Sequence, residues 1–588
     1  MDELIKRDEF ADIASIGKLK MPRIAGILMN VLSINKINEF YANNAHKNAV
    51  DFVDALFEQL NIEFDIDPTE LANLPKEGAF ISVSNHPYGG IEGLFLIKLL
   101  LQQRPDSKVM VNFLLNRIAP LAPHIIPVNP FEDKQDLKSS FAGIKQSLHH
   151  LSEGHPIGTF PAGEVSSFQT NSKSITDREW QDGILRLIQK ADVPVVPIFF
   201  HGNNSLIFQL LGSIHPALRT AKLPSEVFNK KDRKVKVRIG KPISVKEING
   251  FEDHKQMGRF LRAKTYALGS ALEVKKFYRP NLSALKKPEP IANAIPSDVL
   301  LGEIERLRAM DMRIHTQQEF EIYIAYSTDI PNILTEIGRL REITFRAMQE
   351  GTNRALDLDE YDLYYHHLFI WDKEANKLVG AYRLGKGNDI MKKYGKRGFY
   401  VHSLFRLKRK FKPILFETIE LGRSFIVEEY QRKMLPLFLL WKGILYFLIK
   451  NPEYRYLMGP VTISNRYSKL SKSLMIGFIK KNFFREDLAE LVRPRKKFRP
   501  KTKNVDAEII LESSKDDFKS LDKFIQEIEP ERYNIPVLLK KYMKQNARII
   551  AFNVDPKFGQ ALDGLMVLDM NDVPESTIED LKKDFDIK

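Results

Sequence analysis

A proline-rich stretch divides the 588-residue chain into two parts, and each part alternates between predicted strands and predicted helices. Residues 276–298 contain four prolines and little hydrophobic periodicity, a composition typical of a linker. A chain of this length is too long for one hydrophobic core. Because alternating strands and helices are the pattern of the α/β class, the sequence predicts two α/β domains.

The predicted organisation has four segments. A helical segment over 1–60 is followed by an α/β domain over 61–275, the linker over 276–298 and a second α/β domain over 299–588. The predicted strands are 79–86, 108–115, 156–160, 193–200 and 235–240, followed by 320–326, 377–384, 548–554 and 563–570. The predicted helices include 94–104, 330–349 and 416–430.

Two apolar segments bear on membrane contact. Residues 16–32 mix basic and apolar side chains around Pro22, which fits either a helix lying in a membrane interface or a helix packed on the domain. The run 435–449 is too short to span a bilayer, which takes ~20 mostly apolar residues. It also contains Pro436 and Lys442, so we predict a buried helix there.

The formal net charge of +14 indicates either a basic surface for solubility or an anionic partner. Residues 471–503 concentrate this charge, with 11 Lys and Arg against three acidic residues.

The chain has no cysteine, which excludes disulfides, thiolate metal sites and cysteine nucleophiles. The charged N-terminus lacks the apolar core of a secretory signal. We expect neither a metal nor another cofactor.

The motif SNHPYGGIEG, residues 84–93, places His86 at a strand end and Glu92 beyond a Gly-Gly turn. Strand ends of this kind are where α/β proteins position functional groups. A carboxylate beside a histidine fixes its tautomer and stabilises imidazolium, which suits a general base. Without cysteine, the pair is predicted to deprotonate an acceptor hydroxyl. A structural ion pair is the alternative that spacing alone leaves open.

Together with FPAGEVSS (160–167) and VPVVPIFFHG (193–202), this motif resembles the phospholipid and glycerol acyltransferase family over about residues 60–270. The resemblance implies that the pair activates an acceptor hydroxyl for attack on an acyl thioester, with His86 and Glu92 as catalytic residues. It implies substrate contacts for Asn85, Phe160, Pro161 and Gly163.

The chain departs from the family pattern at three places. Five residues separate His86 from Glu92 where the family has four, and the family's Phe-Pro-Glu-Gly-Thr-Arg block lacks its Glu and Arg here. PVNPF (127–131) stands near the place of a phosphate-binding Arg. The missing basic ligands argue against a glycerol-phosphate acceptor. They make the chain similar to the hemolysin-like branch, which includes amino-acid-lipid O-acyltransferases. Glu164 is expected to contact the acceptor, with a turn role as the alternative.

A second group of charged residues lies beyond the linker. Arg341, Phe345 and Arg346 share one predicted helix, LDLDEYD (356–362) follows, and Arg383 ends a strand. Glu420 and Arg423 are three residues apart, on one face of the helix predicted over 416–430. A solvated charged helix is the alternative, but the apolar stretch that follows indicates a domain interior or a cleft edge.

This group resembles the acyl-homoserine-lactone synthases and the ornithine N-acyltransferases, both of the GNAT fold, over about residues 300–570. The resemblance implies that Glu420 accepts the proton of an α-amine, directly or through water, and that Arg423 orients Glu420. It implies a cationic acceptor on Asp359 and Asp362. Arg341, Phe345 and Arg383 complete the implied substrate site. The GNAT pyrophosphate loop is not evident, which favours an acyl carrier protein as donor over coenzyme A.

Together the two parts resemble the fused ornithine-lipid synthases. The resemblance implies that the C-terminal domain transfers a 3-hydroxyacyl group to an amino acid, and that the N-terminal domain acylates the 3-hydroxyl. Ornithine, glycine, lysine and glutamine remain open as the amino acid. One rival is a 1-acylglycerol-phosphate type of lysophospholipid O-acyltransferase with a non-catalytic C-terminal half.

The other rival is a nucleic-acid-binding protein that uses the run 471–503, but this run has few aromatics and no reader motif. The expected partners are acyl carrier protein, a small amino acid, a lyso-lipid and an anionic membrane surface, and we expect no nucleic acid. The expected location is cytoplasmic, peripheral at the inner face of the cytoplasmic membrane, held by the basic run and by residues 16–32.

Overall fold

The computed structural model describes residue 4, residue 29 and residues 33–128, 137–169, 174–205, 208–209, 216–272, 288–502, 504–514, 517–529, 531 and 533–584. The predicted interfacial segment 16–32, except Met29, lies outside these residues, as do parts of 127–131 and of the predicted linker. The chain divides into two compact units. Unit 1 comprises Met1–Val274, Thr502–Lys515 and Lys523–Arg532, and unit 2 comprises Lys275–Lys501, Asp516–Asp522 and Tyr533–Lys588.

Unit 1 contains a seven-stranded sheet that is parallel except at one pair, β8 with β9. Its strands, in spatial order, are β1 (Glu63–Ile66), β9 (Lys234–Ile239), β8 (Val195–Phe200), β2 (Ile81–Ser84), β5 (Ile157–Thr159), β3 (Lys108–Asn112) and β4 (Ile125–Val128). The predicted strands of this part all fall on members of the sheet. The central strand β2 is buried along its whole length.

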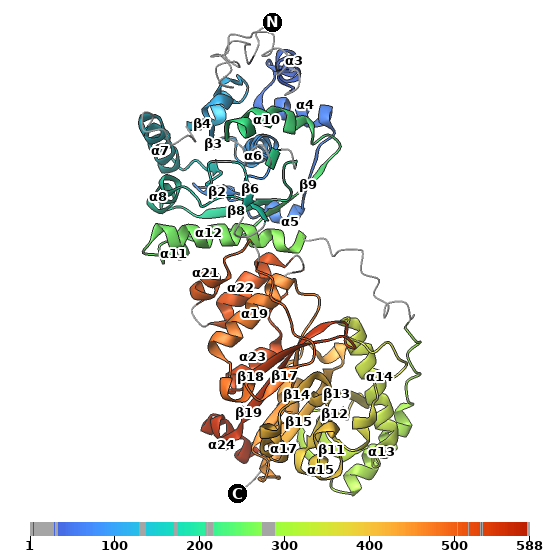
Figure 1. Cartoon of the computed structure of the whole chain (residues 1–588). Helices are drawn as coiled ribbons and strands as arrows, with labels where there is room; N and C mark the ends of the chain where they lie inside the picture. Colours follow the sequence, from blue (N-terminus) through green and yellow to red (C-terminus); the bar gives the residue numbers. More distant parts are fainter. Residues whose placement is uncertain are drawn as a thin grey trace. The chain divides into compact units, whose positions relative to one another are not determined.

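Helices cover both faces of this sheet. Helix α6 (Ile91–Gln103) packs on β3 and β5, and α12 (His254–Leu268) packs on β8 and β2, on the opposite side of the strands in Figure 1. Helix α6 is apolar over most of its surface and also packs against α4 (Ala49–Leu60). Ion pairs join α12 to the distant part of unit 1: Arg259 Nε lies 2.7 Å from Asp506 Oδ2, and Lys264 pairs with Glu527.

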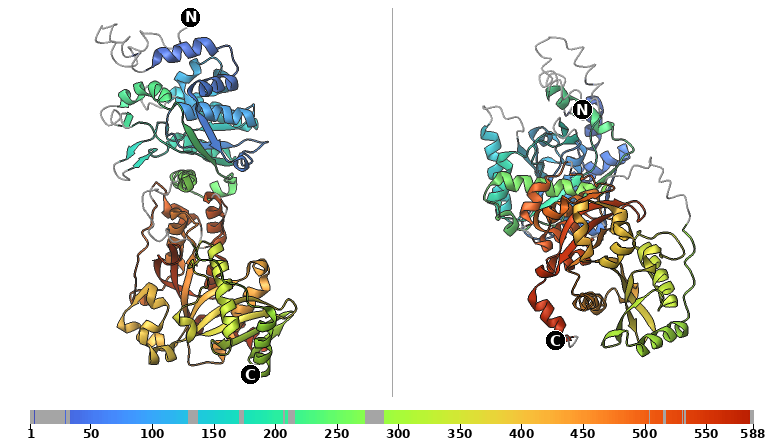
Figure 2. Two further views of the ribbon diagram at one scale, coloured as in Figure 1. Left: turned by 90° about the vertical axis from the view of Figure 1, so that its right-hand side faces the viewer. Right: turned by 60° about the horizontal axis from the view of Figure 1, so that its bottom comes forward.

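Unit 2 contains an eight-stranded, mostly antiparallel sheet. Its strands, in spatial order, are β10 (Arg313–Gln317), β11 (Phe320–Tyr326), β12 (His366–Asp372), β13 (Lys377–Lys386), β15 (Thr418–Ile426), β16 (Tyr456–Ile463), β19 (Ala561–Asp569) and β18 (Arg548–Asp555). The late strand β19 lies beside β16, which is much earlier in the chain (Figures 1 and 2). The predicted strands 320–326, 377–384, 548–554 and 563–570 all fall in this sheet.

The prediction of a helix over 416–430 is wrong, because this segment forms the central strand β15. Its residues Thr418, Ile419, Phe425 and Ile426 are β-branched or aromatic, types that fit a pleated, half-buried surface. Glu420 and Arg423 suggested helical spacing, but a β-bulge produces their arrangement instead. The register of β13 and β15 shifts between Ala381 and Arg383, and Arg423 has a φ of 53°.

The only parallel pair of this sheet joins β15 to β16, and its register covers Thr418–Glu420 and Tyr456–Met458 alone. Within the described residues, β15 continues beyond Glu420 without a ladder to β16. Sheet openings of this kind leave side chains and backbone groups available to a ligand. Arg423, on this part of β15, contacts Asp357 and Asp359.

The helix predicted over 435–449 is confirmed as α18 (Met434–Ile449), with Lys442 largely buried. Pro436 is tolerated because it lies in the first turn, where a backbone N–H has no intrahelical partner. The basic run is not one surface. Its first part lies in α19 (Lys469–Asn482), where Lys472 is buried, whereas its exposed basic residues are Lys480, Lys481, Arg493, Arg495, Lys496, Lys497 and Arg499.

Candidate active sites

The first candidate site lies where β2 ends and α6 begins. His86 follows β2 by two residues, and Glu92 is the second residue of α6. The Nδ1 atom of His86 lies 3.0 Å from Oε1 of Glu92, which is fully buried. The same oxygen accepts hydrogen bonds from the backbone N–H groups of Tyr88, at 2.8 Å, and Gly89, at 2.7 Å. The turn therefore holds the Glu92 carboxylate in place beside the imidazole.

The His86 ring leaves one nitrogen available. Its side chain is 15% exposed, and the ring packs on Phe160 with centroids 4.4 Å apart. Within the described part of the chain, no hydrogen bond occupies Nε2. Because Nδ1 lies 3.0 Å from Glu92, Nε2 is the atom that can accept a proton from a substrate.

A buried aspartate fixes the backbone of His86. Asp177 Oδ1 accepts a hydrogen bond from the His86 N–H at 3.1 Å and from the Ser166 hydroxyl at 2.5 Å. Burial raises the pKa of Asp177. Ser166 also donates its N–H to the carbonyl of His86 at 2.7 Å. These bonds tie the histidine turn to the segment that follows Phe160-Pro161-Ala162-Gly163-Glu164.

The predicted substrate-binding residues of this unit lie around His86 in different settings. Asn85 is buried, and its side-chain amide exchanges two hydrogen bonds with the backbone of Phe200 in β8, so it fixes the end of β2. Phe160 and Pro161 are buried next to the histidine. Glu164 is partly exposed, with Oε1 3.0 Å from Nε of Arg178.

Gly163 makes the tight turn after Pro161 with a φ of 70°, a conformation that favours glycine. A Cβ at this position would clash with the side chain of Gln181. We expect Gly163→Ala to lower the free energy of unfolding by about 1–2 kcal/mol through left-handed strain, with a smaller further cost because the end of the Gln181 side chain must move. Gly154→Ala is the matched control, because Gly154 has a φ of 88° with open space around it. Equal urea midpoints for the two variants would contradict the steric argument.

The second candidate site is built from three arginines and three aspartates in unit 2. Arg341, on α14 (Pro331–Ala347), donates from Nη1 and Nη2 to the two oxygens of Asp362, at 2.9 and 3.0 Å. Arg383 Nη1 lies 2.5 Å from Oδ1 of Asp359 and 3.2 Å from Oδ1 of Asp362. Although burial alone would raise it, the two arginines hold the pKa of Asp362 well below its usual range.

The bulge in β15 turns Arg423 toward the same aspartates. Its Nε lies 3.2 Å from Oδ2 of Asp357, and its Nη2 lies 3.4 Å from Oδ2 of Asp359. Nη1 donates to the hydroxyl of Tyr400 at 3.2 Å. The guanidinium also lies 4.7 Å from the ring centroid of Phe558, which contacts Phe345. The Arg423 side chain is 10% exposed, against 1% for Arg341 and Arg383, so it is the arginine that a substrate can reach.

Glu420 is a buried carboxylate near this cluster of arginines and aspartates. One oxygen accepts from the Tyr365 hydroxyl and from the Tyr400 N–H at 3.0 Å, and the other accepts from the Val401 N–H at 2.6 Å. Burial raises the pKa of Glu420 to about 7, against the opposing effect of these hydrogen bonds. Glu420 can therefore exchange a proton near neutral pH, with Tyr365 as its only side-chain hydrogen-bond partner in the described residues. Arg423 contacts Tyr400 and two aspartates but not Glu420, so it does not orient Glu420 directly.

The pairing of Arg341 gives a stability prediction. Removing one member of a buried pair leaves an uncompensated charge, so Arg341→Ala should lower the free energy of unfolding by about 3–5 kcal/mol. Lys377→Ala is the matched control, since Lys377 and Glu429 form an exposed pair at 3.5 Å that contributes about 0–1 kcal/mol. Chemical denaturation measures both variants. A loss below about 1 kcal/mol for Arg341→Ala would contradict the buried network.

The sequence analysis missed several residues of these sites, namely Tyr88, Ser166 and Asp177 in unit 1 and Asp357, Tyr365 and Tyr400 in unit 2. Asp357 belongs to the acidic segment 356–362, so the sequence analysis could have named it as a site residue. Asp177 lies 91 residues from His86, and no local pattern marks it.

Comparisons with known proteins show that the chain is an acyltransferase. The model of the family described as "Acyltransferase" matches residues 25–275, and the model described as "Acetyltransferase (GNAT) domain" matches residues 340–441. The chain belongs to the acyltransferase family over its N-terminal part and to the GNAT acetyltransferase family over its C-terminal part. The predicted enzyme class and the two predicted domain folds are confirmed.

Different relatives match the two parts of the chain. The chain is 30% identical over 302 residues to glycine N(alpha)-acyltransferase of Phocaeicola vulgatus, covering 49% of this chain and 90% of that one. It is 30% identical over 275 residues to lyso-glycine lipid O-acyltransferase of Bacteroides thetaiotaomicron, covering 44% and 97%. Among solved structures, the 1-acyl-sn-glycerophosphate acyltransferase PlsC from Thermotoga maritima matches at 17% identity and a TM-score of 0.26, covering 39% of this chain and 79% of that one.

Among the described residues, no helix has both the length and the apolar character needed to cross a membrane.

Proposed function

We propose that the chain carries out both acylations of amino-acid lipid synthesis, with glycine as the amino acid. Unit 2 transfers a 3-hydroxyacyl group to the α-amine, and unit 1 then acylates the 3-hydroxyl of that lyso-lipid. The observation that carries the proposal is that one chain holds a His86–Glu92 pair in unit 1 and, in unit 2, a separate arginine–aspartate cluster together with the buried Glu420. The two relatives bear the names of these two steps.

In the O-acylation, Nε2 of His86 takes the proton of the acceptor hydroxyl while the oxygen attacks the thioester carbonyl. The carbon–sulfur bond breaks, and the imidazolium returns the proton to the leaving thiolate. Glu92 stabilises the imidazolium through Nδ1, at 3.0 Å. The hydrogen bond from the His86 backbone N–H to Asp177 fixes the position of the histidine. Phe160 shields one face of the ring.

In the N-acylation, Arg423 and Tyr400 hold the carboxylate of the amino acid, because they are the reachable donors of the network. The amine must lose a proton before it attacks the thioester. Glu420 takes that proton through the Tyr365 hydroxyl, which suits a carboxylate whose pKa burial raises to about 7. As the nitrogen attacks the thioester carbonyl, the carbon–sulfur bond breaks, and the second proton that the nitrogen loses on forming the amide passes to the leaving thiolate.

The ion pairs favour glycine over ornithine as the acceptor. Asp362 is paired with Arg341 and Arg383, and Asp359 is paired with Arg383 and Arg423. The sequence analysis expected these aspartates to bind a cationic acceptor. A cationic side chain would have to displace a buried arginine, whereas glycine brings no second cation. The name of the N-acylating relative supports the same choice.

The donor and the location remain part of the proposal. We expect a 3-hydroxyacyl thioester of acyl carrier protein as donor of the N-acylation, and peripheral contact with an anionic membrane. The exposed end of the basic run, with Arg495, Lys497 and Arg499, supplies positive charge for either acidic partner.

Purified protein supplied with 3-hydroxyacyl carrier protein should acylate glycine at least about tenfold faster than ornithine at equal concentration, since an ornithine complex leaves a buried charge unpaired. Mass spectrometry of the products measures the rates of glycine acylation and of ornithine acylation. Arg423→Lys, which keeps the charge and loses the planar fork, should slow the reaction. A preference for ornithine would contradict the assignment of the aspartates.

A further inference from the structure

A cavity of about 370 Å³ lies between α18 and α23 (Val537–Lys544) in unit 2, and neither proposed acylation uses it. Its volume falls within the range of small-molecule sites, about 300–1,000 Å³. The apolar part of its lining comes from both helices: Leu437, Phe438, Trp441, Ile444, Leu445 and Leu538. The cavity is therefore suited to a hydrocarbon chain.

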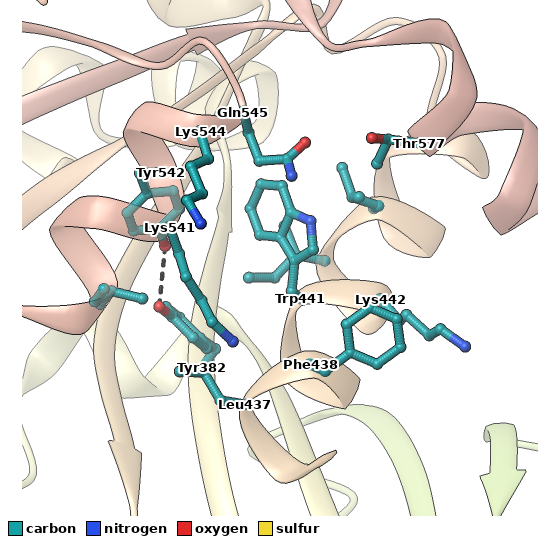
Figure 3. A pocket seen from close by; sticks show the side chains of 13 residues that line it. Tyr382, Leu437, Phe438, Trp441, Lys442, Lys541, Tyr542, Lys544, Gln545 and Thr577 are labelled. Atoms are coloured by element: carbon teal, nitrogen blue, oxygen red, sulfur yellow. Dashed lines mark hydrogen bonds between the residues drawn. The ribbon is translucent and has the colours of Figure 1, made fainter. Parts of the chain in front are cut away.

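The polar part of the lining is cationic. Lys442, Lys541 and Lys544 line the cavity, and no carboxylate does so among the described residues. Figure 3 shows Lys541 and Lys544 directed into the space beside Trp441. Neither Lys541 nor Lys544 forms an ion pair with a carboxylate of the described part of the chain. Burial, with the charge of Lys544, lowers the pKa of Lys541. An anion here would relieve that repulsion.

Two uncharged polar groups also lack partners. The indole N–H of Trp441 and the side-chain carbonyl of Gln545 are buried without a hydrogen-bond partner in the described residues, and both residues line the cavity. Unpaired buried donors and acceptors are costly, so this end of the cavity offers one donor and one acceptor to a polar group of a ligand. Tyr382 and Tyr542, by contrast, bond to each other at 2.9 Å and close one wall (Figure 3).

Exposed apolar side chains occur on both helices that line the cavity. Phe438 is 45% exposed, and Met434, one turn earlier on the same face of α18, is 86% exposed. Val537, at the start of α23, is 57% exposed. Exposed apolar side chains on helices that line a cavity mark a site for an apolar ligand or surface.

We infer that this cavity binds a single-chain anionic amphiphile, with its hydrocarbon chain along α18 and its anionic head on Lys541 and Lys544. Two sources can supply one hydrocarbon chain and an anionic head: a soluble N-acyl amino acid with a free carboxylate, and an anionic membrane phospholipid that inserts one of its chains. The inference does not depend on either acyl transfer, so its test is independent of the test of the proposed function.

Trp441 provides the measurement, since the chain has only three tryptophans. Trp371 is 0% exposed and Trp180 is 7% exposed, whereas Trp441 lines the cavity. A brominated 18-carbon fatty carboxylate should quench the fluorescence of the full-length protein saturably, and Trp441→Phe should remove that quenching. Quenching that persists unchanged in Trp441→Phe, or that never saturates, would overturn the inference.

The charge is tested separately. Lys541→Ser with Lys544→Ser should weaken binding of the carboxylate about tenfold or more, because two charged hydrogen bonds are lost. Lys373→Ser with Lys410→Ser removes two exposed charges outside the cavity and should leave binding unchanged. A brominated alkyl trimethylammonium of equal length should bind at least tenfold more weakly. Equal affinity for both probes, or no effect of the cavity lysines, would refute an anion site.

Competition assigns the source. Displacement of the brominated carboxylate by N-stearoylglycine, without displacement by phosphatidylglycerol vesicles, identifies an N-acyl amino acid as the occupant. Displacement by the vesicles alone, with phosphatidylcholine vesicles as the control, identifies a membrane lipid. If neither competitor displaces the probe, the cavity does not recognise this class of ligand, and the inference fails.

Discussion

His86→Ala should reduce O-acylation of the lyso-lipid by about 10²–10⁴-fold, because a positioned general base contributes an effect of that size. N-acylation should continue, since His86 belongs to unit 1 and the network around Glu420 belongs to unit 2. Cells that express the variant should therefore accumulate the monoacylated, N-linked amino-acid lipid. Lipid mass spectrometry measures the ratio of this lipid to the diacyl product.

The matched control is His149→Ala, which removes a histidine whose side chain is 74% exposed. It should leave the ratio at its wild-type value. Glu92→Gln should give an intermediate loss, since the amide oxygen can still accept the N–H bonds of the turn but no longer carries a charge beside imidazolium. A normal ratio of diacyl to monoacyl lipid in His86→Ala would remove His86 from the catalytic site.

Arg423→Ala should abolish both lipid products, because the O-acylation consumes the product of the N-acylation. Loss of the positioning of the amino acid should slow N-acylation by about 10²-fold or more. The variant also removes the Arg423 Nε that lies 3.2 Å from Asp357, so the thermal unfolding of the variant must be measured together with its activity. Arg423→Lys guards against misfolding, since it retains the positive charge while losing the fork that contacts Tyr400.

Supplying synthetic N-(3-hydroxyacyl)glycine separates the two steps. Folded Arg423→Ala protein should convert this lyso-lipid to the diacyl lipid at the wild-type rate. His86→Ala protein, given the same lyso-lipid, should not. If the Arg423→Ala protein remains inactive while its unfolding temperature is unchanged, the two units do not act as independent steps in sequence.

Local patterns predicted nine of the fifteen strands described in the two sheets, those that are short apolar runs bounded by turns, and missed β1, β4, β10, β12, β15 and β16. The helix predicted over 416–430 shows where such patterns fail. Glu420 and Arg423 have a helical spacing, and only the pairing of β15 with β13, with a bulge at Arg423, produces their actual arrangement. A bulge depends on the partner strand, which a single-segment pattern does not contain.

The candidate sites were predicted unevenly for the same reason. His86 and Glu92 are six residues apart across one turn, so the sequence alone brings them together, and the structure has them 3.0 Å apart. Asp177 reaches the His86 backbone across 91 residues. Asp359 and Asp362 were expected to face a substrate, yet both are paired with arginines from other strands and helices. Long-range pairing of this kind needs the fold.

The most direct test of the central proposal is lipid mass spectrometry of a bacterial host that makes no amino-acid lipids, after expression of the wild-type chain. The proposal predicts two new lipids: N-(3-hydroxyacyl)glycine and its O-acylated diacyl form, with the diacyl form dominant. His86→Ala should shift the pair to the monoacyl form. A host that contains only new glycerophospholipid species, and no amino-acid lipid, would contradict the proposal and favour a lysophospholipid acyltransferase.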